Sequence, residues 1–278
     1  MDAAARSAET FAEIAYAKIN LALHVRRRRE DGYHELETLF AFVDAGDVLH
    51  AQISDEDRLM ICGEFAGGLD TPLDNLVARA LAALPRREGL AITLEKNLPV
   101  AAGLGGGSAD AGAVFRLVDR LFGLPKDHAA RAARLGADVP SCVLSEMALG
   151  QGTGTDLAPV DNDLAGTPVL LVNPREPLST GPVFKAWDAV DRGPLPEASA
   201  REIAQQGRND LTIPAQSLCP QIADILAALE SSGAWLARMS GSGATCFALY
   251  DTQEALAAAD EAIAAHHPKW WRMTGILR

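Results

Sequence analysis

The first half of the chain carries the run Pro99-Val100-Ala101-Ala102-Gly103-Leu104-Gly105-Gly106-Gly107-Ser108-Ala109-Asp110. Four of its residues are glycines within five positions, and a strongly helical segment follows. Glycine turns freely and leaves space for a ligand beside the backbone. A helix that begins at such a loop presents free N–H groups and the positive end of its dipole, which favour an anion such as phosphate. The run therefore predicts either a phosphate-binding loop or a flexible turn before an ordinary helix.

Two familiar phosphate loops do not fit this run. A Walker A loop ends in Gly-Lys-Ser/Thr, yet no lysine lies between Asn97 and Pro125. A dinucleotide fingerprint that starts at Gly103 would need glycine or alanine where Ser108 stands. The loop alone therefore points to nucleotide chemistry without naming a reaction.

Composition restricts the class of protein. The 278 residues suffice for one large domain or two ordinary ones, and 48% hydrophobic with 22% charged residues is typical of a globular protein. A formal net charge of −12 argues against sequence-independent binding to nucleic acid or to an anionic membrane. We therefore expect small-molecule partners, and no nucleic acid or membrane; the oligomeric state is not predicted.

Cysteine and histidine spacing argues against a zinc site or a redox motif, and no metal-ligating residue is predicted. The four cysteines form no Cys-x-x-Cys pair, and the six histidines form no His-x-x-x-His arrangement. Isolated cysteines are typical of a reducing compartment. No apolar run approaches membrane-spanning length, and residues 1–10 lack the apolar core of a signal peptide. We expect a cytoplasmic protein in which residues 1–10 form a loose tail.

Hydrophobic periodicity predicts an α+β protein. Residues 13–25 alternate with period two, as in a strand, and Lys18 and Asn20 lie on the same face, which either faces solvent or lines a cleft. The pattern breaks near residues 158–166, which indicates a domain boundary. Further strands are expected at 35–43, 47–53, 59–62, 90–94, 168–172, 234–239, 245–250 and 270–277, and helices at 75–84, 109–122, 127–135, 181–191, 217–232 and 253–265.

A second loop of small residues and one aspartate are further candidates for a functional site. The small-residue run 239–246 lies between two expected strands, either as a tight hairpin or, together with the first loop, as the other side of a phosphate site. Asp138 follows Gly136 and precedes Pro140, so it is either a helix N-cap or a functional carboxylate.

Seven short motifs, taken in order, resemble the GHMP kinase superfamily, whose members phosphorylate small alcohols with ATP. They are Ala17-Lys18-Ile19-Asn20-Leu21, Asp31-Gly32-Tyr33-His34-Glu35-Leu36, Asp74-Asn75-Leu76-Val77, the run 99–109, Gly136-Ala137-Asp138-Val139-Pro140, Asn209-Asp210-Leu211 and Gly241-Ser242-Gly243-Ala244. The resemblance implies a two-domain GHMP kinase fold, with an N-terminal ribosomal-S5-domain-2-like lobe at 11–160 and a C-terminal ferredoxin-like lobe at 161–278. Residues 150–155 depart from the family by carrying extra threonines, which we expect to alter a turn near the substrate.

The resemblance also implies roles for individual residues. Asp138 would be the catalytic carboxylate that accepts the proton of the substrate hydroxyl, and Lys18 its partner cation. ATP, with Mg²⁺, would be held by Asn75 and by Pro99, Val100, Ala101, Ala102, Gly103, Leu104, Gly105, Gly106, Gly107, Ser108 and Ala109.

The substrate implied is a cytidine diphospho-alcohol. Tyr33 would stack on the cytosine, His34 would hydrogen-bond its edge, and Asn20 would contact the substrate. Phe184 is either an aromatic on the opposite face of the base or a core residue of its helix. The alternatives are another GHMP kinase of the homoserine or mevalonate type, and a non-catalytic nucleotide sensor on the same fold.

Overall fold

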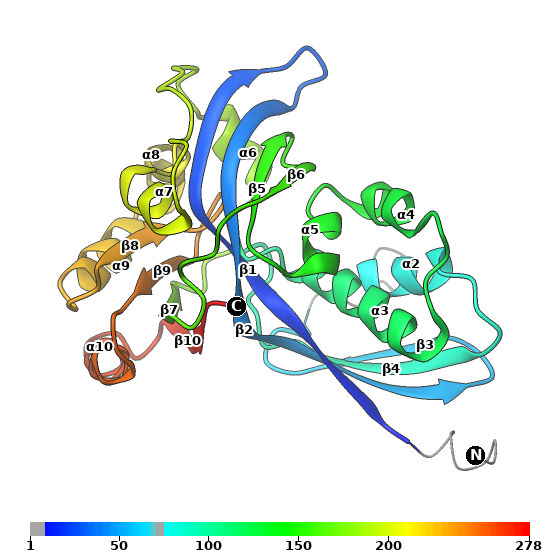
Figure 1. Cartoon of the computed structure of the whole chain (residues 1–278). Coiled ribbons are helices and arrows are strands. Elements are labelled where there is room, and N and C mark those ends of the chain that lie inside the picture. Colours follow the sequence, from blue (N-terminus) through cyan, green and yellow to red (C-terminus); the bar gives the residue numbers. More distant parts are fainter. Residues whose placement is uncertain (1–8, 68, 70–74) are drawn as a thin grey trace. The chain divides into compact units, whose positions relative to one another are not determined.

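The structure, a computed structural model, describes residues 9–67, 69 and 75–278. They form two compact units, each assembled from separate stretches of chain (Figure 1). The first unit comprises the described residues up to 17 together with 46–100 and 106–145; the second comprises 18–45, 101–105 and 146–278. The predicted lobes at 11–160 and 161–278 stay a prediction. Most of the predicted tail, and Asp74 of the third motif, lie outside the described residues.

Two long paired strands, β1 (Phe11–Arg28) and β2 (His34–Ser54), pass through both units. The sequence predicted two strands at 35–43 and 47–53, but these are one continuous strand. Gly46, which lies between them, does not turn the chain. A Cβ at this position would stand 2.0 Å from the carbonyl oxygen of Ala15, so glycine lets β2 approach β1 closely.

The first unit packs helices against a small sheet. β4 (Gly89–Glu95) pairs antiparallel with the last part of β2 and parallel with β3 (Arg58–Cys62). The helices lie on one side of these strands (Figure 1). They are α2 (Leu76–Ala83), α3 (Gly106–Phe122), α4 (His128–Leu135) and α5 (Val139–Leu144). α3 packs against both α2 and α5.

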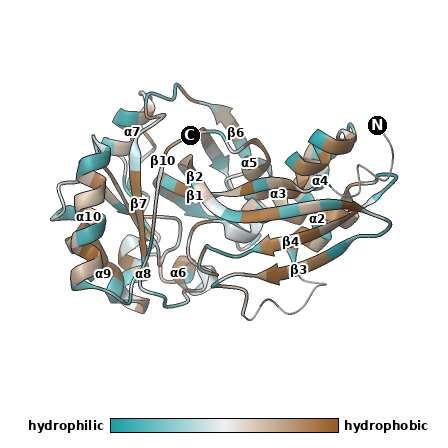
Figure 2. Cartoon of the chain, turned by 90° about the horizontal axis from the view of Figure 1, so that it is seen from below, coloured by the Kyte–Doolittle hydropathy of each residue, from teal (hydrophilic) through white to brown (hydrophobic). Residues whose placement is uncertain are grey.

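The second unit contains a four-stranded antiparallel sheet in the order β10-β7-β9-β8. Its strands are β7 (Pro168–Asn173), β8 (Leu236–Met239), β9 (Cys246–Leu249) and β10 (Trp271–Ile276). All six residues of β7 are buried, and the strand is largely hydrophobic in Figure 2. The helices α9 (Gln221–Glu230) and α10 (Gln253–His266) pack on the sheet. This strand order is the ferredoxin-like arrangement that the sequence predicted.

The remaining elements of the second unit extend β2 and join the strands of the sheet. β5 (Ala148–Gly152) pairs with β2 and with β6 (Asp156–Pro159). The shorter helices are α6 (Thr180–Lys185), α7 (Ala200–Gln206) and α8 (Thr212–Leu218). The strands β5 and β6 and the helix α7 were not predicted, and α5 was expected only as a helix that Asp138 could cap. No helix in the described part of the chain combines the length and apolar character that crossing a bilayer demands.

Two predicted helices are wrong in extent. The helix expected at 217–232 is divided between α8 and α9, because Pro220 disfavours helical dihedrals at Cys219, which adopts φ −138° and ψ 85°. The helix expected at 181–191 ends at Lys185. The carboxylate of Asp188 accepts the backbone N–H of Val190 at 3.1 Å, and such a local side-chain bond competes with the helix.

Candidate active site

In the second unit, the first glycine loop packs against the small-residue loop at 240–245. The Ser240 hydroxyl donates to the carbonyl oxygen of Gly103 at 2.7 Å, and the Thr245 N–H donates to Ala102 O at 3.1 Å. A Cβ at Gly103 would lie 2.3 Å from Ser240 O, and the φ of Gly103 is +76°. Only glycine fits this contact. Met239 and Cys246 are opposite each other in the antiparallel pair β8–β9, which confirms the expected hairpin at 239–246. Its loop also contacts the first glycine loop.

Asn209 holds the small-residue loop in place through hydrogen bonds to its backbone. Its side-chain amide donates to Met239 O and to Gly241 O, each at 2.8 Å. Its Oδ1 accepts the N–H of Leu211 at 2.9 Å. Through Asn209, the motif Asn209-Asp210-Leu211 therefore stabilises the loop that contacts Gly103.

In the first unit, α3 begins at Gly106, three residues earlier than predicted. Its first turn contains Gly106, Gly107, Ser108 and Ala109 and no acidic residue. Ser108 is half-buried. The free N–H groups of this turn and the helix dipole fit a phosphate. Asn75 caps α2, because its Oδ1 accepts the N–H of Val77 at 2.8 Å; its role toward the nucleotide stays a prediction.

A buried ion network lies beside the start of α3. Lys96 Nζ donates to carboxylate oxygens of Asp47 and of Asp110, and all three side chains are buried. A Cβ on Gly106 would lie 3.6 Å from Lys96 Nζ. The other oxygen of Asp47 accepts the N–H of Leu98 at 2.7 Å. The network thus links residues 96–98, which precede the glycine loop, to Asp110 of α3, which follows the loop. This network was not predicted.

The polar face of β1 does not face solvent in the second unit. Lys18 is 4% exposed and Asn20 2% exposed, so the solvent-facing interpretation is wrong. Lys18 Nζ lies 4.5 Å from the centroid of the Phe40 ring, and its backbone N–H donates to Leu104 O at 3.0 Å. Asn20 is bonded through its backbone to Ser240 and through its side chain to Thr38.

Asp138 stands directly before α5 in the first unit. It occupies the N-cap position, yet its side chain makes no capping hydrogen bond, so the capping interpretation does not account for its carboxylate. Its carbonyl oxygen accepts from the Ser141 hydroxyl at 2.8 Å and from the Cys142 N–H at 3.1 Å. The catalytic roles of Asp138 and of Lys18, which belong to different units, stay predictions.

Aromatic rings gather at the start of β2 in the second unit. The His34 ring centroid lies 4.9 Å from that of Phe184 and 5.7 Å from that of Trp187, the latter edge-on. Tyr33 is 65% exposed, as a ring that stacks on a ligand would be. Phe184 also packs against the hydrophobic core of this unit, which the core interpretation expected. Trp187 was not predicted as a neighbour of His34.

His34 has a pKa below the ordinary value of an imidazole. Burial, and then the charge of Arg28, lower its pKa, so the imidazole is neutral at pH 7. His34 is 8% exposed, and its Nε2 has no hydrogen-bond partner within the described chain. A neutral imidazole has one donor and one acceptor nitrogen, which suits the edge of a base.

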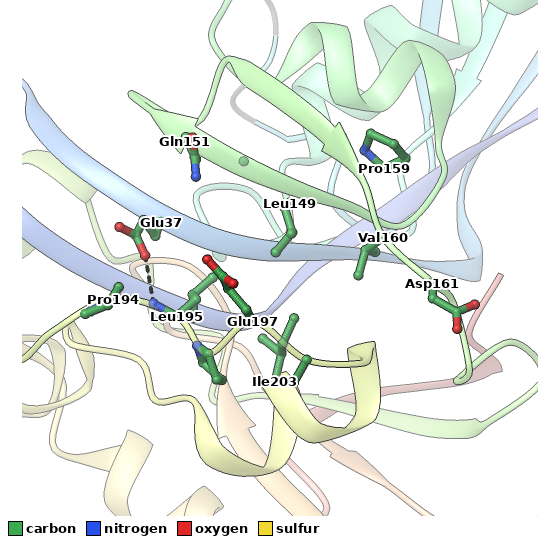
Figure 3. Close-up of a pocket in the computed structure, with 13 residues that line it drawn as sticks. Glu37, Leu149, Gln151, Pro159, Val160, Asp161, Pro194, Leu195, Glu197 and Ile203 are labelled. Atoms are coloured by element: carbon green, nitrogen blue, oxygen red, sulfur yellow. Dashed lines mark hydrogen bonds between the residues drawn. The ribbon is translucent and has the colours of Figure 1, made fainter.

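A cavity of about 470 Å³ also lies in the second unit (Figure 3). The segment 194–198 and the β5–β6 hairpin line it, together with Glu37, which accepts the N–H of Leu195 at 2.7 Å. Among its described lining residues is none of the predicted site residues. The cavity is therefore separate from the predicted site.

Comparison with known proteins places the chain in a family. Residues 75–146 match the family model described as GHMP kinases N terminal domain, and residues 195–269 match GHMP kinases C terminal. The chain belongs to the GHMP kinase family. It is an ATP-dependent kinase with the two-domain GHMP kinase fold, as the resemblance implied.

Its relatives narrow the class further. The 4-diphosphocytidyl-2-C-methyl-D-erythritol kinase of Erythrobacter litoralis is 66% identical over 270 residues, which cover 96% of this chain and 99% of the relative. The enzyme of the same name from Novosphingobium aromaticivorans is 68% identical over 266 residues, with 96% and 92% covered.

A solved structure of a kinase with an equivalent name also resembles this chain. A crystal structure of 4-(cytidine 5'-diphospho)-2C-methyl-D-erythritol kinase matches with a TM-score of 0.81 and 35% identity, covering 96% of this chain and 99% of the other. Homoserine kinase from Cytophaga hutchinsonii matches with a TM-score of 0.67 but only 17% identity, over 96% and 95% of the two chains, and this likeness concerns the fold alone.

Proposed function

We propose that this kinase transfers the γ-phosphoryl group of ATP to the 2-hydroxyl of 4-diphosphocytidyl-2-C-methyl-D-erythritol, in the non-mevalonate pathway to isoprenoid precursors. The observation that carries the proposal is buried His34, which follows exposed Tyr33 in the chain and has its ring centroid 4.9 Å from that of Phe184. Its Nε2 has no hydrogen-bond partner among the described residues. Such a group recognises a planar base by its edge. The relatives that share 66% and 68% of their residues with this chain bear the name of that kinase.

The nucleotide is proposed to bind at the first turn of α3. Gly106 and Gly107 leave the backbone N–H groups of this turn accessible, and the helix dipole favours the phosphate charge. When bound, ATP supplies the phosphoryl group, and its accompanying Mg²⁺ neutralises charge on the phosphates. Ser108 is the hydroxyl of this turn that would meet a phosphate oxygen or the Mg²⁺. No cluster of three or more metal-ligating side chains occurs in the described chain.

Lys18 and Asp138 are proposed as the catalytic residues. Asp138 accepts the proton of the attacking hydroxyl. Its carboxylate has no capping role toward α5. Lys18 supplies positive charge that offsets the negative charge of the transferring group. Phosphoryl transfer is often loose, so we expect positioning and electrostatics to contribute more than basicity.

The acceptor is proposed to be held by Tyr33, His34, Phe184 and Asn20. Stacking on Tyr33 tolerates different bases, whereas edge hydrogen bonds to His34 discriminate among them. We propose a cytoplasmic enzyme without nucleic-acid partners, which the net charge of −12 and four free cysteines support.

A coupled assay of ADP release tests the substrate assignment. The purified enzyme is offered ATP with the cytidine diphospho-alcohol, with homoserine or with mevalonate. We expect turnover only with the cytidine compound. Turnover with homoserine or mevalonate instead would overturn the assignment, and no turnover with any alcohol would favour a nucleotide sensor.

A further inference from the structure

We propose that Thr38 is a positioning residue: it fixes the side-chain amide of Asn20 so that Oδ1 is presented to a hydroxyl of the substrate alcohol. The inference rests on the proposed function, because it takes Asn20 as a substrate-binding residue. It adds a second residue, on another strand, which controls what Asn20 offers to the ligand.

The hydroxyl of Thr38 determines the orientation of the amide. Thr38 Oγ1 lies 2.7 Å from the carbonyl oxygen of Ala22, which only accepts, so the single hydroxyl hydrogen is directed there. The same Oγ1 lies 2.8 Å from the terminal amide of Asn20 and must therefore accept from it. The Asn20 atom that faces Thr38 is consequently the nitrogen, and Oδ1 points away from Thr38.

The oxygen thus presented has no partner. Asn20 is 2% exposed, and within the described chain no donor reaches its Oδ1. The neighbouring Ser240 hydroxyl is directed to Gly103 O, and it accepts the backbone N–H of Asn20 at 3.3 Å. A buried acceptor without a donor costs about 1–3 kcal/mol, which a ligand that supplies the donor would recover.

Gly241 lies beside this oxygen and carries no side chain that would cover it. A Cβ on Gly241 would lie 3.4 Å from Asn20 Oδ1, so a side chain there would occupy the approach to it. An acceptor selects a donor, and the donors that an alcohol substrate carries are its hydroxyl groups. In this orientation Asn20 accepts a hydrogen bond from a substrate hydroxyl, whereas the flipped amide could only donate to the oxygen of that hydroxyl.

A double-mutant cycle on the full-length enzyme tests this role. Thr38→Val keeps the shape of the side chain and removes the hydroxyl, and Thr38→Ser keeps the hydroxyl. The readout is kcat/KM for the alcohol in the wild-type and Asn20→Ala backgrounds, with KM for ATP as the check on folding. We expect Thr38→Val to lower kcat/KM about tenfold in the wild-type background, since one oriented hydrogen bond is lost. We expect Thr38→Ser to stay within about twofold of wild type, and Thr38→Val to add less than about twofold to Asn20→Ala.

Three results would overturn the role of Thr38. They are an unchanged kcat/KM in Thr38→Val, the same loss in both backgrounds, and a loss in Thr38→Ser as large as that in Thr38→Val. The cycle uses whichever alcohol the wild type phosphorylates. Failure of the substrate assignment is therefore seen in the wild type alone, and failure of the Thr38 role is seen only in the variants.

Discussion

Lys96 Nζ donates to Asp110 Oδ2 at 2.8 Å in the interior of the first unit. Asp47 accepts from the same ammonium group, so one positive charge faces two carboxylates. Burial raises the pKa of Asp110, the charge of Lys96 opposes this, and the charge of Asp47 adds to it, with a net rise to about 8. The three coupled groups therefore share an extra proton near neutral pH.

This proton predicts how stability depends on pH. An aspartate in the unfolded chain ionises at about pH 4, whereas folded Asp110 keeps its proton to about pH 8. Between these values the folded state binds more protons, so the free energy of unfolding falls as pH rises and the cost is complete above about pH 8. We expect Asp110→Asn to flatten this decline and to be more stable than wild type at about pH 9. Urea unfolding of both proteins from about pH 5 to 9 measures this free energy of unfolding.

The matched control for this experiment is Asp119→Asn. Asp119 lies on the same helix but is exposed. The control removes the same formal charge from α3 without touching the buried network. A pH profile for Asp110→Asn that parallels the profiles of wild type and Asp119→Asn would contradict the protonated Asp110.

The glycine loop and the ferredoxin-like sheet could be predicted because their signals are local. Glycine spacing marks the loop, and short, fully buried apolar runs mark β7 and β9. The contacts that build the candidate site are not local. Ser240 and Gly103 are 137 positions apart, and nothing in either segment specifies the partner. Thr38 did carry a usable signal, since it is a lone hydroxyl in a buried run beside Leu39 and Phe40.

A second prediction concerns the contact between the two loops. Gly103 has a φ of +76°, and Gly103→Ala would place a Cβ 2.3 Å from Ser240 O and 2.9 Å from Gly243 O. Both oxygens belong to the backbone, so neither can move aside by a change of rotamer. If the loop helps to hold the nucleotide, we expect KM for ATP to rise at least about tenfold. This corresponds to about 1.4 kcal/mol, roughly the contribution of one hydrogen bond. Steady-state kinetics with varied ATP measures it. Gly181→Ala is the control, because nothing lies within 4 Å of its added Cβ; equal KM values for the two variants would refute the role of the loop.

A third prediction separates the two substrates. Tyr33 is 65% exposed, so Tyr33→Ala should leave the melting temperature nearly unchanged. Loss of a stacking ring costs about 1–3 kcal/mol, so we expect KM for the cytidine substrate to rise about tenfold or more while KM for ATP stays constant. Tyr33→Phe keeps the ring and should remain close to wild type. A similar rise in both KM values would show that Tyr33 does not contact the cytosine.

The last prediction concerns Lys18 and Asp138, the proposed catalytic pair. Asp138→Asn keeps the size of the side chain and, since the carboxylate makes no capping bond, should not weaken α5. We expect kcat to fall by about a hundredfold to ten-thousandfold, the range for loss of a positioned acid–base group. Lys18→Ala should reduce kcat by a comparable factor.

Lys18 is 4% exposed, so its truncation also leaves a cavity, and Lys18→Met serves as the control that restores most of the volume without the charge. Thermal melting distinguishes the two effects. We expect Lys18→Met to melt near wild type yet to be as inactive as Lys18→Ala, because the charge and not the volume supports phosphoryl transfer. Near-normal turnover of Lys18→Met or of Asp138→Asn would remove that residue from the catalytic pair.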